Sequence, residues 1–210
     1  MTENRFLQKV DHNKFGRDTL LDEAINAYLH GLLIAGSKEE MAKMAAILAR
    51  KMHGNSGNGN GMEYKPSAKN LANIYPQYML DNHDRTKLAD RLKIAMKKNE
   101  TRNDRQLEDD FLSISRGLMT YGASFFEVDV FTTKKNFGNG QALVGVNDHG
   151  LHIILKKAWN VKNLRFDEFA AIFRDSKTIE IDAQRSRDLH FIMVSTQMKF
   201  LKGILQKFQG

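Results

Sequence analysis

Side chains suited to catalysing a reaction or holding a metal are few and scattered along this chain. His149 and His152 have the His-x-x-His spacing found in some metal sites. They straddle a predicted turn and strand, and no set of carboxylates or thiolates completes a tetrahedral site with them. No Ser, His and Asp stand in the setting of a nucleophile elbow. We therefore expect a non-enzymatic protein with no cofactor and no bound metal.

A glycine-rich segment at residues 54–61, with the sequence GNSGNGNG, is the second candidate for chemistry. A phosphate-binding loop needs Gly-Lys-Ser/Thr at the start of a helix, where backbone amides and the lysine face the phosphate. Here Met62, Glu63 and Tyr64 follow instead. The segment therefore indicates a flexible surface loop.

Positive charge is the strongest chemical signal in the sequence. The formal net charge is +7, which favours an acidic partner such as anionic lipid, nucleic acid or an acidic protein surface. Nucleic acid is the weaker reading, because no DNA- or RNA-binding module is recognisable. A solvated basic face explains any single lysine, whereas several together predict contact with anionic lipid at about 1 kcal/mol for each. The lysines assigned to this contact are Lys134, Lys135, Lys156, Lys157 and Lys199.

Length and composition bound the class of protein. With 210 residues, the chain has room for one domain or two small ones. It contains no cysteine, which excludes disulfides and thiolate metal sites and fits a reducing compartment. No apolar run approaches the roughly 20 residues needed to span a bilayer, and the N-terminal segment resembles neither a signal nor a transit peptide. We therefore expect a cytoplasmic protein.

The elements that must position these residues change from helix to strand near Gly122. Before it, Leu107, Phe111, Ile114 and Leu118 recur at steps of three and four residues, as along one face of a helix. The first helix is expected after an N-cap at Asp18 or Thr19, and the second opens with Ser37-Lys38-Glu39-Glu40, a capping-box pattern. The predicted helices cover residues 20–32, 37–52, 71–79, 84–98 and 104–121.

After Gly122, apolar and polar residues alternate, as in strands with one buried face. A last helix should begin at Ser195 or Thr196 and bury Met198, Leu201 and Leu205. The fold class is therefore α+β: a helical bundle at residues 20–121, then a seven-strand sandwich or open barrel capped by a C-terminal helix at 122–210. The predicted strands cover residues 125–132, 142–147, 151–156, 164–166, 170–174, 178–182 and 189–194.

A helical part followed by a β part resembles a FERM domain, and three segments carry the resemblance. They are the Leu-Ala-Asn-Ile-Tyr-Pro-Gln-Tyr run at 71–78, the Tyr-Gly-Ala-Ser-Phe-Phe-Glu-Val run at 121–128, and Leu-Val-Gly-Val at 143–146 before a hairpin. The pattern is most similar to talins and to the tails of FERM-bearing myosins. The resemblance implies an acyl-CoA-binding-protein-like middle lobe and a C-terminal lobe of the PTB/PH-like fold. Residues 1–19 would then be the end of a missing first lobe or a linker from it.

The resemblance also implies a peptide site, because a partner strand can add to the exposed edge of such a lobe. The edge would be the fifth strand, with room for the partner beside the two small alanines. The last helix would supply the other wall. The site residues are Ala170, Ala171, Ile172, Phe173, Arg174 and Asp175 on the edge, with Met198, Lys202 and Leu205 on the helix.

These expectations describe a non-enzymatic adaptor. It would link the cytoplasmic tail of a membrane receptor, or a cargo peptide, to the actin or microtubule cytoskeleton, at the inner face of the plasma membrane. Two alternatives stay open: a purely lipid-binding module that targets membranes, and an autoinhibitory tail that binds another part of its own parent protein.

Overall fold

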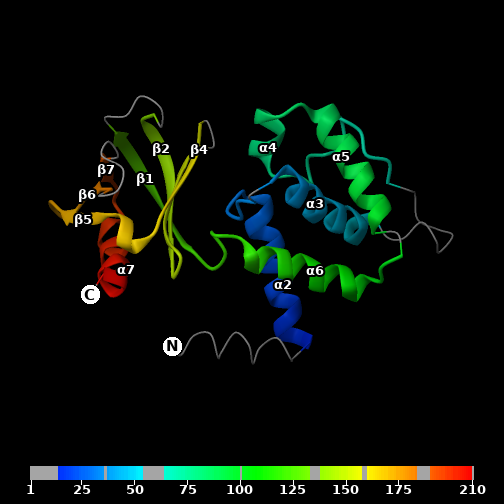
Figure 1. Cartoon of the computed structure of the whole chain (residues 1–210), viewed down its shortest axis with the longest axis horizontal. Helices are drawn as coiled ribbons and strands as arrows, with labels where there is room; N and C mark the ends of the chain where they lie inside the picture. The colour runs from blue at the N-terminus through cyan, green and yellow to red at the C-terminus, as the bar shows by residue number, and fades with distance from the viewer. Residues whose placement is uncertain are drawn as a thin grey trace. The chain divides into compact units, whose positions relative to one another are not determined.

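The computed structural model describes residues 14–35, 37–53, 64–99, 101–132, 138–157, 160–183 and 190–209. The chain divides into two compact units, Met1–Tyr121 and Gly122–Gly210. The first is helical and the second combines a sheet with one helix (Figure 1). Residues 1–13 of the predicted lobe end or linker and the glycine-rich loop at 54–61 lie outside the described residues.

The helical unit is built around α3, whose alanine-rich sequence lets the neighbouring helices approach closely. Its residues between Met41 and Ala49 are mostly buried, and it packs against both α5 and α6. The predicted capping box at its start is confirmed: the Glu40 backbone N–H donates to Ser37 Oγ at 3.1 Å, and the Ser37 N–H to Glu40 Oε2 at 3.2 Å. The helices are α2 (Lys14–Leu29), α3 (Lys38–His53), α4 (Gln77–Asn82), α5 (Arg85–Lys98) and α6 (Asp104–Gly117).

Three predicted helices have wrong ends. The helix expected at residues 71–79 spans only Gln77–Asn82, because Pro76 stands at its N-cap and the residues before it form turns. Helix α2 already begins at Lys14, so Asp18 and Thr19 lie inside it rather than at its N-cap. Its first turns are held by Arg17, whose guanidinium lies 2.9 Å from the Asp109 carboxylate on α6; such a tertiary contact leaves no local signal. Helix α6 ends at Gly117 instead of near residue 121, because the next residue has the extended ψ of 139°. The positive φ of 69° at Gly122 therefore belongs to the turn before the first strand.

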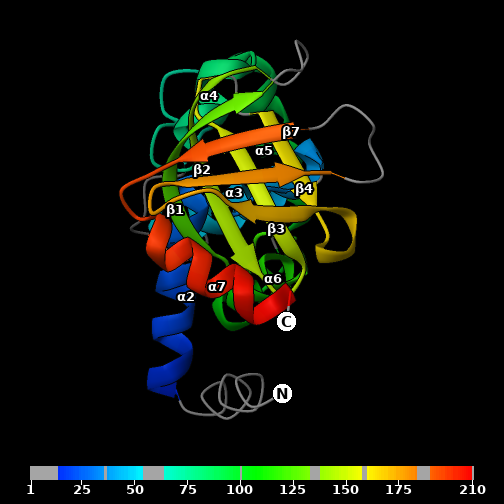
Figure 2. The same ribbon diagram turned by 90° about the vertical axis from the view of Figure 1, so that its left-hand side faces the viewer.

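The second unit contains one antiparallel sheet of seven strands in the order β4-β3-β2-β1-β7-β6-β5. Strand β1 pairs with β2 along one edge and with β7 along the other. Figure 2 shows β5–β7 in front of β2–β4, with α7 alongside. The elements are β1 (Ser124–Thr132), β2 (Gly140–Asn147), β3 (Gly150–Leu155), β4 (Asn160–Leu164), β5 (Ala170–Phe173), β6 (Thr178–Asp182), β7 (His190–Val194) and α7 (Met198–Gln209).

A single core fills the space that the bent sheet encloses. Val144 on β2, Ile179 on β6 and Phe191 on β7 are all fully buried in it. Helix α7 plugs this core with Met198, Leu201 and Leu205, which recur at helical spacing. The predicted α+β fold with a C-terminal helical cap is therefore confirmed.

The fourth strand is the one that sequence pattern misplaced. It was expected at residues 164–166 but spans Asn160–Leu164, and a short 3₁₀ turn, η2 (Phe166–Glu168), follows it. As the other edge of the sheet it pairs only with β3, so its polar sequence lacks the alternation of a two-sided strand. The predicted hairpin before it is confirmed. Gly150 there has φ 136°, and a Cβ on it would lie 2.1 Å from the Leu164 carbonyl oxygen.

No helix in the described ranges is long and apolar enough to cross a membrane.

Candidate functional site

Strand β5 lies at the end of the strand order, at the edge position predicted for it. Its only partner in the described sheet is β6, with Ala170 opposite Asp182 and Phe173 opposite Ile179. The Arg174 backbone N–H donates to the Thr178 carbonyl at 3.2 Å. Because backbone groups alternate in direction along a strand, the N–H and C=O groups of Ile172 also face β6. Those of Ala171 and Phe173 face the free edge.

Helix α7 lies along β5 and runs in the opposite direction. Near its start, Lys202 places its ammonium group 5.4 Å from the centre of the Phe173 ring and donates a hydrogen bond to the Asp175 carbonyl. Near its end, Phe208 stacks on Phe166, with ring centres 4.8 Å apart and planes 10° apart. We call β5 and these flanking side chains of Phe166, Lys202 and Phe208 the β5–α7 strip.

The side chains of β5 divide between the two faces of the sheet. Ala171 and Phe173 are half-buried and pack against the core. Ile172 points to the outer face, where 41% of it is exposed. Ala170 is half-buried on that same outer face. The strand therefore presents backbone groups at its edge, and Ile172 is the side chain of β5 that stands out from the outer face.

Two residues predicted for the second wall do not line the surface. Met198 and Leu205 are fully buried, because helical spacing places them with Leu201 on the face that plugs the sandwich. A helix face that packs in the core cannot also contact a partner, and the face with Met198 and Leu205 packs in the core. Of the three predicted helix residues, Lys202 alone lies beside the strand.

Arg174 and Asp175 shape the turn that follows β5. Arg174 donates to the Glu180 carboxylate, which His190 also contacts. The hydrogen bond from Arg174 is the main reason that the pKa of Glu180 is lowered. Asp175 Oδ1 accepts from the Lys177 backbone N–H at 2.7 Å, and this bond lowers the pKa of Asp175. Both side chains therefore hold the β5–β6 hairpin together.

Sequence reasoning missed the roles of Phe166 and Phe208. Phe166 was assigned to a strand, whereas its ring stacks on that of Phe208 at the far end of the β5–α7 strip. Phe208 remains 43% exposed. The available signal was the aromatic residue that follows Met198, Leu201 and Leu205 at helical spacing.

The structure describes three of the five predicted lipid-binding lysines. Lys134 and Lys135 lie outside the described residues. Lys156 is paired with Glu127, with 2.5 Å between Nζ and Oε1, and this bond lowers the pKa of Glu127. Lys157 and Lys199 are exposed. Charge compensation at Lys156 therefore weakens the predicted basic surface.

The two histidines have structural surroundings. His152 is fully buried on β3, with Nδ1 2.9 Å from Asn163 Oδ1 and Nε2 2.9 Å from Asn147 Oδ1. Burial lowers the pKa of His152. His149 lies on the adjacent turn with an exposed imidazole. Within the described ranges, no group of three His, Asp or Glu side chains is placed to hold a metal ion.

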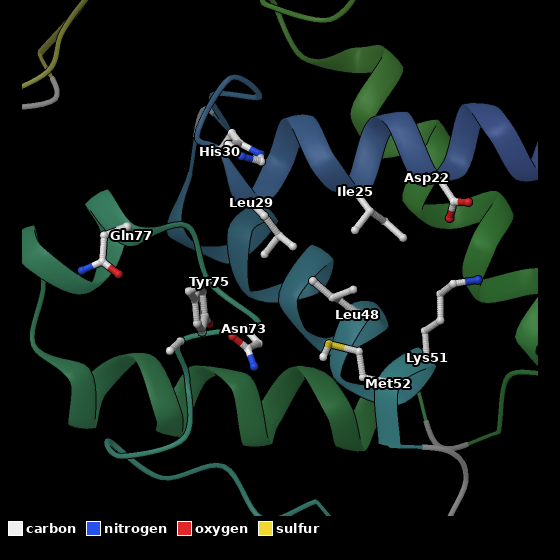
Figure 3. A pocket seen from close by; sticks show the side chains of 11 residues that line it. Asp22, Ile25, Leu29, His30, Leu48, Lys51, Met52, Asn73, Tyr75 and Gln77 are labelled. Atoms are coloured by element: carbon white, nitrogen blue, oxygen red, sulfur yellow. The ribbon is translucent and has the colours of Figure 1, made fainter.

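The helical unit has a hollow of about 680 Å³ between α2, α3 and the segment before α4 (Figure 3). Two of its polar side chains are engaged elsewhere: Lys51 pairs with Glu108 at 3.0 Å, and Gln77 donates to Asp81 at 2.7 Å. Asp22, His30 and Asn73 are the other polar residues of the lining. Its lining includes Ile25, Leu29, Leu48, Met52 and Tyr75.

Comparison with known proteins agrees with the two-unit architecture. Residues 12–126 match the FERM central domain. No curated protein matches the chain.

Three solved structures share the fold. The human myosin 7b C-terminal MyTH4-FERM domain, in complex with the harmonin-a PDZ3 domain, has a TM-score of 0.58 at 16% identity, covering 90% of this chain and 37% of that one. The Dictyostelium discoideum myosin VII MyTH4-FERM MF2 domain (mutant 1) has a TM-score of 0.61 at 13% identity, with the same coverages of 90% and 37%. Drosophila Merlin, as the complex of its FERM and C-terminal domains, has a TM-score of 0.50 at 17% identity, covering 94% of this chain and 64% of that one.

The chain thus spans little more than a third of the two myosin chains it matches. The match to the central domain extends over more than half of the chain, and the likeness in fold continues through the sheet and α7. The chain therefore belongs to the FERM family, of which it carries the helical middle lobe and the PTB/PH-like C-terminal lobe.

Proposed function

We propose that this chain is a non-enzymatic adaptor whose C-terminal lobe binds an extended peptide by strand addition at β5. The observation that carries the proposal is the edge itself: β5 ends the sheet, and the backbone groups of Ala171 and Phe173 face outward. An incoming strand gains main-chain hydrogen bonds there, and its side chains meet the β5–α7 strip.

The structural relatives support a role in protein binding. The myosin 7b domain is seen with harmonin-a PDZ3, and the Merlin FERM domain with its own C-terminal domain. For this chain, the proposed partner is a receptor tail or cargo peptide, and the parent protein would supply the link to the cytoskeleton at the inner face of the plasma membrane. The narrower likeness to talin, and the binding of phosphoinositide by the predicted lysines, stay predictions.

The autoinhibitory alternative uses the same edge with a peptide from the parent protein. It differs in the source of the strand, so a peptide array that contains both receptor tails and segments of the parent separates the two. The peptide that binds most tightly then serves as the probe for every variant.

Replacing Ala171 with proline tests strand addition directly. Proline is tolerated on an edge strand when the lost N–H faces solvent, so the variant should fold and lose one donor to the partner strand. One hydrogen bond contributes about 1 kcal/mol net, and the ring also obstructs the partner, so binding should weaken at least about fivefold. Fluorescence anisotropy with the array-selected peptide gives the affinity, and circular dichroism checks folding.

The matched control is Ile192→Ala on β7, which removes an exposed outer-face side chain two strands away from the free edge. A partner strand added at β5 does not reach it, so peptide affinity should stay within about twofold of the parent. If folded Ala171→Pro protein binds the peptide as tightly as the parent, the edge is not the site.

A further inference from the structure

One face of α7 is turned away from the sandwich that the helix plugs (Figure 2). Because Met198, Leu201 and Leu205 are fully buried, the orientation of the helix about its axis is fixed. At 100° per residue, the exposed positions fall together on the opposite side. This outer α7 face consists of Lys199, Phe200, Gly203, Gln206 and Lys207.

Phe200 protrudes from the middle of this face. It is 69% exposed, more than any other large apolar side chain in the described part of the chain. Gly203 lies one turn further on and contributes no side chain. A Cβ there would meet nothing within 4 Å, and its φ is not in the positive region, so neither crowding nor backbone strain requires a glycine. The Phe200 ring therefore projects from this face next to a position without a side chain.

Charge on α7 has one sign. The helix carries Lys199, Lys202 and Lys207 and no carboxylate. Lys202 is engaged at the β5–α7 strip, which leaves Lys199 and Lys207 exposed on either side of Gly203.

A contrast is available on the outer face of the sheet. Phe131 on β1 is 50% exposed and stands beside Ile192 in the register. That face carries Asp129, Glu180 and Asp182, and Arg174 and His190 both contact Glu180. The charged residues of α7 near Phe200 are therefore all basic, whereas those near Phe131 are of both signs.

We propose that the outer α7 face is a contact site for an anionic membrane surface, with the Phe200 ring in the headgroup region and Lys199 and Lys207 beside lipid phosphates. Aromatic and basic side chains on one face of a helix are the pattern of interfacial binding, and lysines near an anionic surface add to it. A protein partner is disfavoured, because stable protein interfaces bury about 800 Å² on each side and this face offers one large apolar side chain.

Tryptophan at position 200 reports insertion. The full chain with Phe200→Trp is mixed with vesicles of phosphatidylcholine and phosphatidylserine, and its fluorescence is compared with that of the parent chain, which accounts for the native tryptophan. The added emission should shift to the blue and be quenched by brominated lipid. It should do neither with phosphatidylcholine vesicles alone, and both effects should weaken as salt is raised.

Phe131→Trp is the matched control, since it places the same probe at an exposed aromatic position on the outer face of the sheet, away from α7. Brominated lipid should leave it unquenched. In co-sedimentation, Phe200→Ala should weaken vesicle binding roughly tenfold, and Lys199→Gln or Lys207→Gln about fivefold each. All these positions are exposed, so unchanged thermal unfolding excludes misfolding as the cause.

Three results overturn the proposal. The first is vesicle binding without quenching at position 200, which places the membrane contact elsewhere. The second is no binding to the anionic vesicles at all. The third is a fluorescence change on adding a Glu-rich peptide but not vesicles, which assigns the face to an acidic protein. These assays contain no peptide ligand of β5, so none of the three results bears on the proposal that a peptide adds to β5 as a strand.

Discussion

Single side chains show how little of this chain is arranged for chemistry and how much for packing. His152 is the example, because its ring is closed in between two asparagines on neighbouring strands. Asn147 Oδ1 also accepts the His149 backbone N–H at 2.9 Å, so this one oxygen ties the turn to the His152 ring. The residue that looked most like a metal ligand in the sequence has both ring nitrogens occupied by amide side chains.

Acidification should therefore destabilise the C-terminal lobe through His152. Burial lowers its pKa below the ordinary 6.5, so the unfolded chain binds the proton more readily than the folded one. Stability from this group is complete above 6.5 and is lost as the pH falls through the lower folded value. Urea unfolding across this pH range measures it.

His152→Gln should flatten that dependence, whatever it does to stability at neutral pH. His83→Gln is the companion variant, since burial also lowers the pKa of His83, in the helical lobe. A parent slope that survives both substitutions would contradict the assignment to these histidines.

At the scale of elements, hydrophobic period was a sound guide, and contact between elements was beyond its reach. The apolar stripe of α7 was recognisable because burial repeats every three or four residues. What the same stripe faces is decided by distant strands, and the sequence reading used Met198 and Leu205 for core and for partner at once. The stacking of Phe166 on Phe208 was likewise invisible, because no local pattern links a turn to a helix end.

Two alanine substitutions on α7 should distinguish a residue that stabilises the core from a residue of the β5–α7 strip. Leu205→Ala removes a fully buried side chain and should lower the free energy of unfolding by about 2–5 kcal/mol. Lys202→Ala removes an exposed contact to Phe173 and Asp175, and should cost less than about 1 kcal/mol while changing peptide affinity at β5. Chemical denaturation and anisotropy give the two readouts. Equal losses of stability would mean that Leu205 is not a core residue.

Across the whole molecule, the two units have separate cores. One cluster of buried side chains runs from Leu21 to Leu118, and the other from Val128 to Leu205. The change of hydrophobic period near Gly122 made this division visible in the sequence. The order of the strands was accessible only through the resemblance, since pairing depends on contacts between residues distant in the chain.

The fragment 122–210 should therefore fold by itself. Among the described residues, its core cluster contains no side chain from the helical unit, so the fragment should show one cooperative thermal transition. It should also retain peptide binding at β5 with an affinity within a few-fold of the full chain. Calorimetry and anisotropy on the isolated fragment check both expectations. A fragment that gives no cooperative transition would show that the helical unit is required.

Strand order also has a kinetic consequence. Strands β1–β4 and β5–β7 are two meanders in which each strand pairs with the next one in the chain, whereas β1 and β7 come from opposite ends of the unit. Closing that long loop costs entropy before any contact repays it. The hairpins should thus form early and the β1–β7 pairing late. Because the β5–α7 strip belongs to the part attached by that late step, a newly synthesised chain should complete this proposed peptide site only as folding finishes.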